Sequence, residues 1–282
     1  MRRFKYAYSA LVYYGEDIGT SIDRVARFGY DGIELLGQPE TYDAPAVRRR
    51  VSDAGIAVSS ISSVISADRD FAHPDPEIRA NALAYLNSLT DLAVDVGAPV
   101  IVGRPSASMK LLPLADPEDE WRWAVDGLRA AGEYAAERGV SVALECWTRF
   151  ETYFLNRLEQ AVELWEAIGL TNGGVMGDTF HMNIEESSLG DAIRHAGPHL
   201  AHMHLADSNR LPPGYGHADF REVLRALDEV DYTGWLAFEL LPDTADPFTV
   251  FRAGGHADFF DRYTRDAITH MRRLEAELGA TD

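Results

Sequence analysis

The sequence contains one cysteine, Cys146, among 282 residues. A single cysteine allows no disulfide within the chain, so a disulfide-stabilised secreted domain is excluded. A reducing cytoplasm is the expected location.

Long hydrophobic runs are also missing. No stretch approaches the about 20 consecutive apolar residues that a membrane-spanning helix needs. The first six residues, Met1–Tyr6, include two arginines but no apolar segment follows them, so no signal peptide is expected. The sequence therefore predicts neither a membrane protein nor an exported one.

Positive charge is scarce. The chain has 26 Lys and Arg against 45 Asp and Glu, which gives a formal net charge of −19. This field repels phosphate backbones and anionic lipids, so nucleic acid and membrane surfaces are excluded as expected partners.

What the sequence does contain is a regular alternation of short apolar runs and amphipathic segments. The apolar runs are rich in Val, Ile, Leu and Ala without strict alternation, as expected of parallel strands buried on both faces. The expected strands are Phe4–Val12, Gly32–Leu36, Ile56–Val64, Pro99–Gly103, Val140–Trp147, Gly174–Asp178, Leu200–Ala206 and Trp235–Leu240.

The amphipathic segments between them predict helices. The expected helices are Asp17–Phe28, Ala46–Ala54, Pro76–Val96, Pro117–Arg138, Leu158–Ile168, Leu189–Ala196, Phe220–Val230 and His256–Leu278. A glycine follows each of the first five, at the position where a left-handed residue ends a helix: Gly29, Gly55, Gly97, Gly139 and Gly169.

Eight strands alternating with eight helices favour a single (β/α)8 TIM barrel over residues 1–282. A doubly wound open sheet is the alternative. Its dinucleotide-binding form carries a Gly-rich G-x-G-x-x-G turn after the first strand, and the segment Ser9–Gly15 does not match that pattern. No linker or low-complexity stretch divides the chain, so one domain is expected.

Active sites of such barrels lie at the carboxyl ends of the strands. Four consecutive expected strands carry a polar residue there: Glu145, Asp178, His204 and Glu239. Three carboxylates packed at the mouth of a barrel repel one another strongly unless a cation lies between them. Oxygen ligands with one imidazole suit Mn²⁺, Mg²⁺ or Co²⁺ better than structural zinc. A hydrogen-bonded cluster without a metal is the alternative.

Three further residues near these strand ends have open roles. His202 lies two positions before His204 and points to the same side of the strand, so it either supports the metal site or packs in the core. Glu34, near the end of the second strand, points to the same rim and is a candidate hydrogen-bond partner for a ligand. His217 follows a Gly-Tyr-Gly turn and is a candidate to approach the site.

Glu145 and Glu239 come from the fifth and eighth strands, on opposite sides of the barrel. This is the arrangement needed to remove a proton from one face of a carbon and return one to the other face. A metal chelated by a carbonyl and the adjacent hydroxyl would acidify the neighbouring C–H and stabilise the enediolate.

The sequence resembles the ketose 3-epimerases, which include the tagatose and psicose (allulose) epimerases of the xylose isomerase-like barrels. The resemblance is densest between residues 140 and 240. It rests on the segment DTFHMNIEE from Asp178, the pattern H-x₅-R-x₃-G-x-G from His204, and the segment Glu145–Asn156, ECWTRFETYFLN.

The resemblance implies roles for individual residues. Glu145, Asp178, His204 and Glu239 match the family's ligands of one divalent metal, and the two glutamates also match its proton-transferring pair. Glu151, His181 and Arg210 match its substrate-contacting residues, with His181 expected one short loop beyond the sixth strand. A sugar is the implied substrate, and a homodimer or homotetramer is the implied assembly.

Three segments depart from the family pattern. After the expected first strand the chain reads Tyr13–Glu16, after the fourth Arg104–Lys110, which lacks an expected aromatic, and after the eighth Glu239–Phe248. In the family these loops contact the far end of the sugar. The chemistry is therefore predicted better than the substrate.

Other functions use the same kind of site. Related barrels cleave C-glycosides oxidised at the sugar 3-position, by proton abstraction and aglycone elimination, together with a small β-rich subunit. Isomerases of inositol-derived ketones or hydroxypyruvate are further relatives. An endonuclease IV-like enzyme would need about three zinc ions and a basic DNA-binding face, which this sequence lacks. A non-catalytic sugar-binding protein would not need the paired glutamates.

Overall fold

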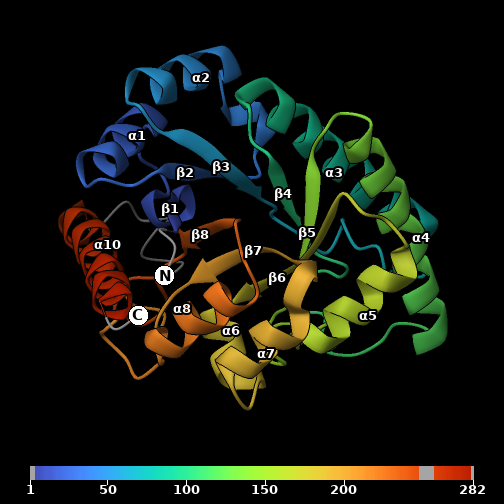
Figure 1. Ribbon diagram of the computed structural model, residues 1–282. Coiled ribbons are helices and arrows are strands. Elements are labelled where there is room, and N and C mark those ends of the chain that lie inside the picture. The colour runs from blue at the N-terminus through green and yellow to red at the C-terminus, as the bar shows by residue number, and fades with distance from the viewer. Residues whose placement is uncertain (1–3, 248–256, 281–282) are drawn as a thin grey trace.

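The described residues, 4–247 and 257–280 of the computed structural model, form a closed barrel of eight parallel strands (Figure 1). Each strand pairs with its neighbour in chain order, and β1 pairs with β8 to close the ring. The predicted (β/α)8 architecture is confirmed. The strands are β1 Lys5–Ser9, β2 Gly32–Leu36, β3 Ala57–Ser62, β4 Val100–Gly103, β5 Ser141–Glu145, β6 Gly173–Asp178, β7 Leu200–Leu205 and β8 Trp235–Phe238.

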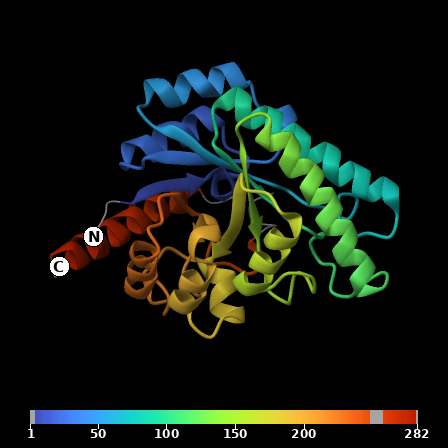
Figure 2. The same ribbon diagram turned by 45° about the vertical axis from the view of Figure 1, so that its right-hand side comes forward.

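The helices lie around the outside of the strands (Figures 1 and 2). They are α1 Ile18–Arg27, α2 Ala44–Asp53, α3 Pro76–Val96, α4 Pro117–Ala136, α5 Leu158–Ile168, α6 Thr179–Glu185, α7 Leu189–Ala196, α8 Phe220–Glu229 and α10 Ala257–Gly279. Short 3-10 helices cover Ala10–Tyr13, Pro39–Thr41 and Gly197–His199. None of the helices in the described ranges is long and apolar enough to cross a membrane.

The glycines expected to end helices adopt the backbone conformation that this role requires. Gly97 and Gly169 are left-handed C-caps of α3 and α5, with φ of 82° and 76°. Gly29, Gly55 and Gly139 also have positive φ. The helix ends were therefore readable from local chemistry.

Most expected ends of strands and helices differ from the described ones by one or two residues, and two larger departures have a local cause. The first strand ends at Ser9 rather than Val12, because the Ser9 side chain accepts a hydrogen bond from the Leu11 amide and caps a 3-10 helix. The expected loop after β6 is instead helix α6, which begins immediately because Asp178 caps it through the Phe180 amide, at 2.8 Å. The expected start of the last helix, His256, and the segment Met1–Arg3 lie outside the described residues.

The barrel interior changes character along its axis. Val100, Val102, Ala143 and Met176 form a small apolar cluster separate from the main core. Because side chains alternate along a strand, Ala143 and Met176 share a face with Glu145 and Asp178 two residues later. The interior is thus apolar beneath a polar layer at the carboxyl ends of the strands, where the site lies.

The last helix is fixed to the beginning of the barrel. The Phe4 amide donates to Glu275 at 2.6 Å, and Arg272 of α10 donates to the Phe4 carbonyl at 2.9 Å and to Asp31 at 2.7 Å. These contacts join residues 241 to 271 positions apart in the chain.

Candidate active site

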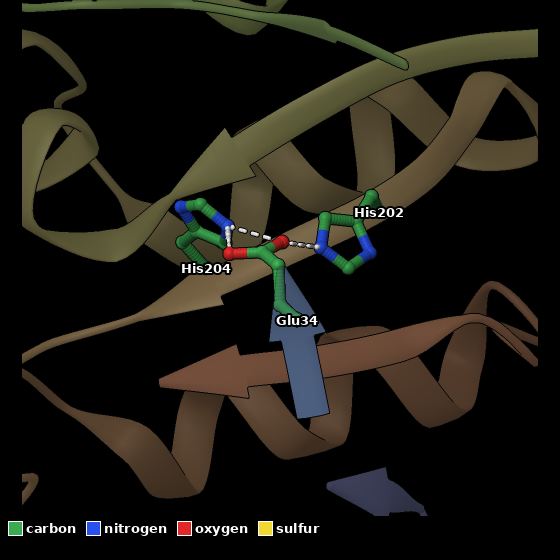
Figure 3. A group of neighbouring side chains, drawn as sticks. All are labelled: Glu34, His202 and His204. Atoms are coloured by element: carbon green, nitrogen blue, oxygen red, sulfur yellow. Dashed lines mark hydrogen bonds and ion pairs between the residues drawn. The ribbon is translucent and has the colours of Figure 1, made fainter. Parts of the chain in front are cut away.

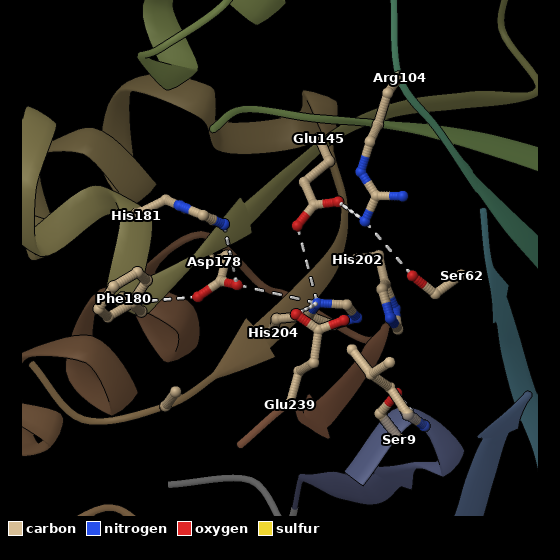
Figure 4. A network of polar contacts seen from close by, with 12 residues as sticks. Ser9, Ser62, Arg104, Glu145, Asp178, Phe180, His181, His202, His204 and Glu239 are labelled. Atoms are coloured by element: carbon tan, nitrogen blue, oxygen red, sulfur yellow. Dashed lines mark hydrogen bonds and ion pairs between the residues drawn. The ribbon is translucent and has the colours of Figure 1, made fainter. Parts of the chain in front are cut away.

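Four strand ends bring the predicted metal ligands together. Glu145 and Asp178 are the last residues of β5 and β6, His204 lies in β7, and Glu239 directly follows β8. All four are buried, and one ligand atom from each lies within 4.8 Å of the others. Figure 4 shows them pointing toward a common centre from four strands.

The centre of this cluster is defined by His204 Nδ1. It lies 3.8 Å from Glu145 Oε1, 4.0 Å from Asp178 Oδ2 and 3.6 Å from Glu239 Oε2. Neither His204 Nδ1 nor Glu145 Oε1 has a hydrogen-bond partner among the described residues, although both atoms are buried. Buried polar atoms without partners are costly. Three carboxylates and one imidazole facing one point therefore fit a divalent cation.

The electrostatics of the cluster also fit a cation. Burial raises the pKa of Glu145 to about 7, in spite of the positive charges nearby. Burial raises the pKa of Glu239 as well, but His204 and Arg210 outweigh it and lower that pKa to about 2. Burial lowers the pKa of His204, yet Glu34 and Glu239 raise it well above its ordinary value. The imidazole thus lies in a surplus of negative charge, which a metal ion would neutralise.

Glu34 is buried and contacts Nε2 of His204, the ring nitrogen that faces away from the three carboxylates (Figure 3). His204 Nε2 lies 3.0 Å from both Glu34 oxygens, and His202 Nε2 lies 3.1 Å from Oε2. The Ser60 hydroxyl donates to the same oxygen at 2.7 Å. Metal-binding histidines commonly donate their second N–H to a carboxylate in this way. The open role of His202 is resolved as a hydrogen-bond partner of Glu34, outside the four-ligand cluster.

Arg210 reaches the cluster from the loop after β7. It donates to Asp178 Oδ2 at 2.6 Å and forms an ion pair with Glu239, while its guanidinium lies 4.7 Å from the Phe180 ring centre. Its backbone has a φ of 64°. The buried Asp207 stabilises this turn, because its carboxylate accepts hydrogen bonds from the backbone amides of Ser208, Gly214 and Ala218.

His181 and Glu151 lie beside the cluster on the side of Asp178. His181 is buried in α6, with Nε2 3.8 Å from Asp178 and Nδ1 3.8 Å from Glu151. Its Nδ1 accepts a hydrogen bond from the Thr148 amide at 3.3 Å. Burial lowers the pKa of His181 to about 3, although Asp178 acts in the opposite direction. A neutral imidazole therefore presents its Nε2 side to the cluster.

Sequence reasoning missed Arg104, which directly follows β4 and forms an ion pair with Glu145. The available signal was the same one that identified the ligands, a charged residue at the end of an expected strand. His217, in contrast, hydrogen-bonds the Ser208 hydroxyl at 2.7 Å and is not one of the clustered residues.

Comparison with known proteins gives a consistent result. Residues 22–272 match the family model described as the xylose isomerase-like TIM barrel. The chain is 32% identical over 226 residues to D-psicose 3-epimerase of Ruminiclostridium cellulolyticum, covering 77% of this chain and 76% of that protein. It is 34% identical over 212 residues to L-ribulose 3-epimerase of Mesorhizobium japonicum, covering 75% and 71%.

Structural similarity covers nearly the whole chain. The D-psicose 3-epimerase of Clostridium cellulolyticum H10, solved with D-tagatose, superimposes with a TM-score of 0.85 at 27% identity, over 96% of this chain and 99% of that one. In sequence, the chain is also similar to 3-dehydro-D-guloside 4-epimerase of Escherichia coli. The two are 27% identical over 85% of this chain and 93% of that protein. The chain belongs to the ketose 3-epimerases of the xylose isomerase-like TIM barrel family, and it is an enzyme of the isomerase class.

Proposed function

We propose that this enzyme inverts a carbon next to the carbonyl of a free keto-sugar, with one divalent metal ion held by Glu145, Asp178, His204 and Glu239. The observation that carries the proposal is the convergence of these four buried side chains, with two glutamates approaching from β5 and β8. Mn²⁺ is the expected metal, with Mg²⁺ and Co²⁺ as further candidates.

A divalent metal held by these four residues would polarise the sugar carbonyl as a Lewis acid and offset negative charge on the sugar oxygens. The two glutamates move the proton. One carboxylate removes the hydrogen from carbon 3 on its own side of the sugar, and the protonated form of the other returns a hydrogen to the opposite face. The two residues exchange roles in the reverse direction.

The surrounding residues bind and orient the sugar. Arg210 offers a planar set of N–H donors beside Asp178 and Glu239. The neutral imidazole of His181 can donate one hydrogen bond without adding charge, and Glu151 is half-buried on the same side. These three residues are proposed to contact the oxygens at the carbonyl end of the sugar.

The substrate is proposed to be a free ketose, as the names of the relatives suggest. The E. coli relative is named for a keto-glycoside, so the experiment must include both classes. A panel of ketoses and 3-keto-glycosides is incubated in D₂O with metal-depleted protein, with and without Mn²⁺. Deuterium at carbon 3 of a ketose, with inversion and only with metal, is the expected result. No exchange into any ketose, with aglycone release from 3-keto-glycosides, would contradict the proposal.

The cellular setting and assembly are part of the same proposal. The chain is proposed to act in the cytoplasm as a homodimer or homotetramer. Light scattering on the purified protein tests the assembly, and a monomer at micromolar concentration would contradict it.

A further inference from the structure

Arg104 is a buried arginine in contact with Glu145, one of the two proton-transferring glutamates. Neither the family resemblance nor the proposed mechanism gives it a role. Its side chain is 7% exposed, and its guanidinium forms an ion pair with Glu145 Oε2. Figure 4 shows Arg104 approaching Glu145 from the side away from Asp178 and His181. The guanidinium also lies 4.4 Å from the centre of the Trp147 ring.

The far side of the guanidinium is anchored to the end of β3. Arg104 Nη1 donates to the Ser63 carbonyl and, at 3.0 Å, to the Ser63 hydroxyl, and Nη2 lies 3.5 Å from the Ser62 hydroxyl. The hydrogen bonds to Ser63 and the stacking on Trp147 leave the guanidinium little freedom to rotate. Its N–H groups therefore point in a fixed direction. A lysine at this position would keep the charge but lose the fork of donors.

Glu145 depends on this arginine for its orientation. Neither of its carboxylate oxygens makes a hydrogen bond to any described residue, so the ion pair between Oε2 and Arg104 is its closest charged contact. Glu239 also has an arginine, because Arg210 donates a hydrogen bond to its Oε2 and forms an ion pair with it. Each proton-transferring glutamate therefore has its own arginine, one from the end of β4 and one from the loop after β7.

We propose that Arg104 is a positioning residue that holds Glu145 in the orientation for proton transfer. With Oε2 on Arg104, Oε1 faces His204 Nδ1 at 3.8 Å. The inference rests on the proposed epimerase function. Arg104 contacts Glu145 and not Glu239. A positioning role therefore predicts an effect on one direction of proton transfer, which a role in overall stability does not predict.

The consequence is an asymmetry between the two epimers. The epimer whose carbon 3 hydrogen faces Glu239 still loses its proton normally when Arg104 is removed. A misplaced Glu145 is slow to protonate the resulting enediolate. Glu239 therefore returns a proton to the face from which it was removed. In D₂O, once Glu239 has exchanged its proton with solvent, this epimer takes up deuterium before it is converted. The epimer that faces Glu145 reacts slowly and takes up little deuterium before conversion.

The experiment measures deuterium in unconverted sugar from each member of the epimer pair, at low conversion, for the wild type, Arg104→Met and Arg104→Lys. Arg104→Met is expected to lower kcat about 100-fold, the size of effect that a misplaced reacting group can produce. KM should change little, because the lost interaction acts in the transition state. Excess deuterium should appear in one unconverted epimer only, and Arg104→Lys should show the same asymmetry with a smaller loss.

Arg138→Met is the matched control. Arg138 also stacks on an aromatic ring, at 3.4 Å from the Tyr134 centre, but it lies beyond the end of α4 on the surface. Its replacement should leave kcat and the deuterium distribution unchanged. If Arg104→Met does not fold, judged by circular dichroism, Arg104→Lys carries the test.

The outcomes separate the two proposals. Equal deuterium uptake into both epimers, or an unchanged kcat in the Arg104 variants, would overturn the role given to Arg104 and leave the epimerase function standing. A wild-type enzyme that exchanges no carbon 3 hydrogen of any ketose would overturn the proposed function, and the inference with it.

Discussion

At the scale of single residues, each member of the four-residue cluster has a partner that fixes its direction. Each of the three carboxylates contacts an arginine, Asp178 also accepts from a helix amide, and the imidazole is held by a buried carboxylate. The pairs are Glu145 with Arg104, Glu239 with Arg210, Asp178 with the Phe180 amide, and His204 with Glu34. Charged side chains at a buried site need such partners, since they cannot turn to water.

The first prediction concerns the two glutamates. Glu145→Gln and Glu239→Gln keep the side-chain volume but remove the group that accepts and returns a proton. Each should lower kcat by a factor of about 10² to 10⁴, the usual contribution of a general acid or base. Turnover of the ketose found for the wild type is the measurement. An activity within twofold of wild type for either variant would refute the proton-transfer assignment.

The second prediction concerns Glu34. Glu34→Gln weakens the hydrogen bond that directs His204 Nδ1 toward the carboxylates, so the affinity for Mn²⁺ should fall about 10- to 100-fold. Isothermal titration of metal-depleted protein measures this without any substrate. Glu40→Gln, an exposed glutamate in the next loop, is the control. Unchanged affinity, or two metal ions bound per wild-type chain, would contradict this role for Glu34.

At the scale of elements, the loops after β3, β4 and β5 are joined by one buried lysine. Lys110 Nζ lies 3.0 Å from Asp70 and 2.8 Å from Glu120, and it donates to the Ala72 carbonyl at 2.8 Å. Its backbone carbonyl accepts from the Tyr153 amide at 3.0 Å. This connection holds the segment that carries Glu151, because the Glu151 carbonyl accepts from the neighbouring Met109 amide.

The third prediction follows from that connection. Lys110→Met would leave two buried carboxylates without their cation and should lower the free energy of unfolding by about 3–5 kcal/mol. Urea unfolding followed by circular dichroism is the measurement. The chain has only one other lysine, the exposed Lys5, so Lys5→Met is a matched control that should cost less than about 0.5 kcal/mol. Equal effects of the two variants would contradict the prediction.

The fourth prediction is the pH dependence of the same contact. Burial raises the pKa of Glu120, but hydrogen bonds from Lys110 and Tyr153 outweigh it and the pKa is lowered. A carboxylate with a lowered folded-state pKa stabilises the protein above its unfolded pKa, about 4.3, and this stabilisation is lost as the pH falls through the folded-state value. The stability difference between the wild type and Glu120→Gln should therefore be largest near pH 7 and shrink below pH 4. A difference that grows on acidification would contradict this sign.

At the scale of the whole molecule, the net charge of −19 and the buried carboxylates both favour the binding of cations. A metal that binds only the folded chain stabilises it by mass action, by about 2.7 kcal/mol at 100 times its Kd. The single-domain organisation stays a prediction, and the hydrogen bonds between α10 and Phe4, directly before β1, agree with it.

The fifth prediction is a metal-dependent Tm. Treatment with EDTA should lower the Tm, and added Mn²⁺ should raise it progressively with concentration. Differential scanning fluorimetry measures the shift, with Ca²⁺ as a control ion, which prefers more oxygen ligands. The double variant Glu145→Gln, Glu239→Gln should lose most of the shift. A shift of equal size in that variant would place the responsible metal elsewhere.

The sequence by itself determined the barrel, the order of its strands, most of the helices and the four residues that cluster at the strand ends. These depend on local patterns: apolar runs, glycine stops and polar residues at strand ends. The tertiary structure decided what lies next to those residues. Glu34 on β2, Arg104 after β4 and Lys110 in the following loop gain their partners from other segments, 10 to 170 residues away in the chain. A charged side chain shows its charge in the sequence, but whether it is buried and paired depends on which segments the closed barrel brings together.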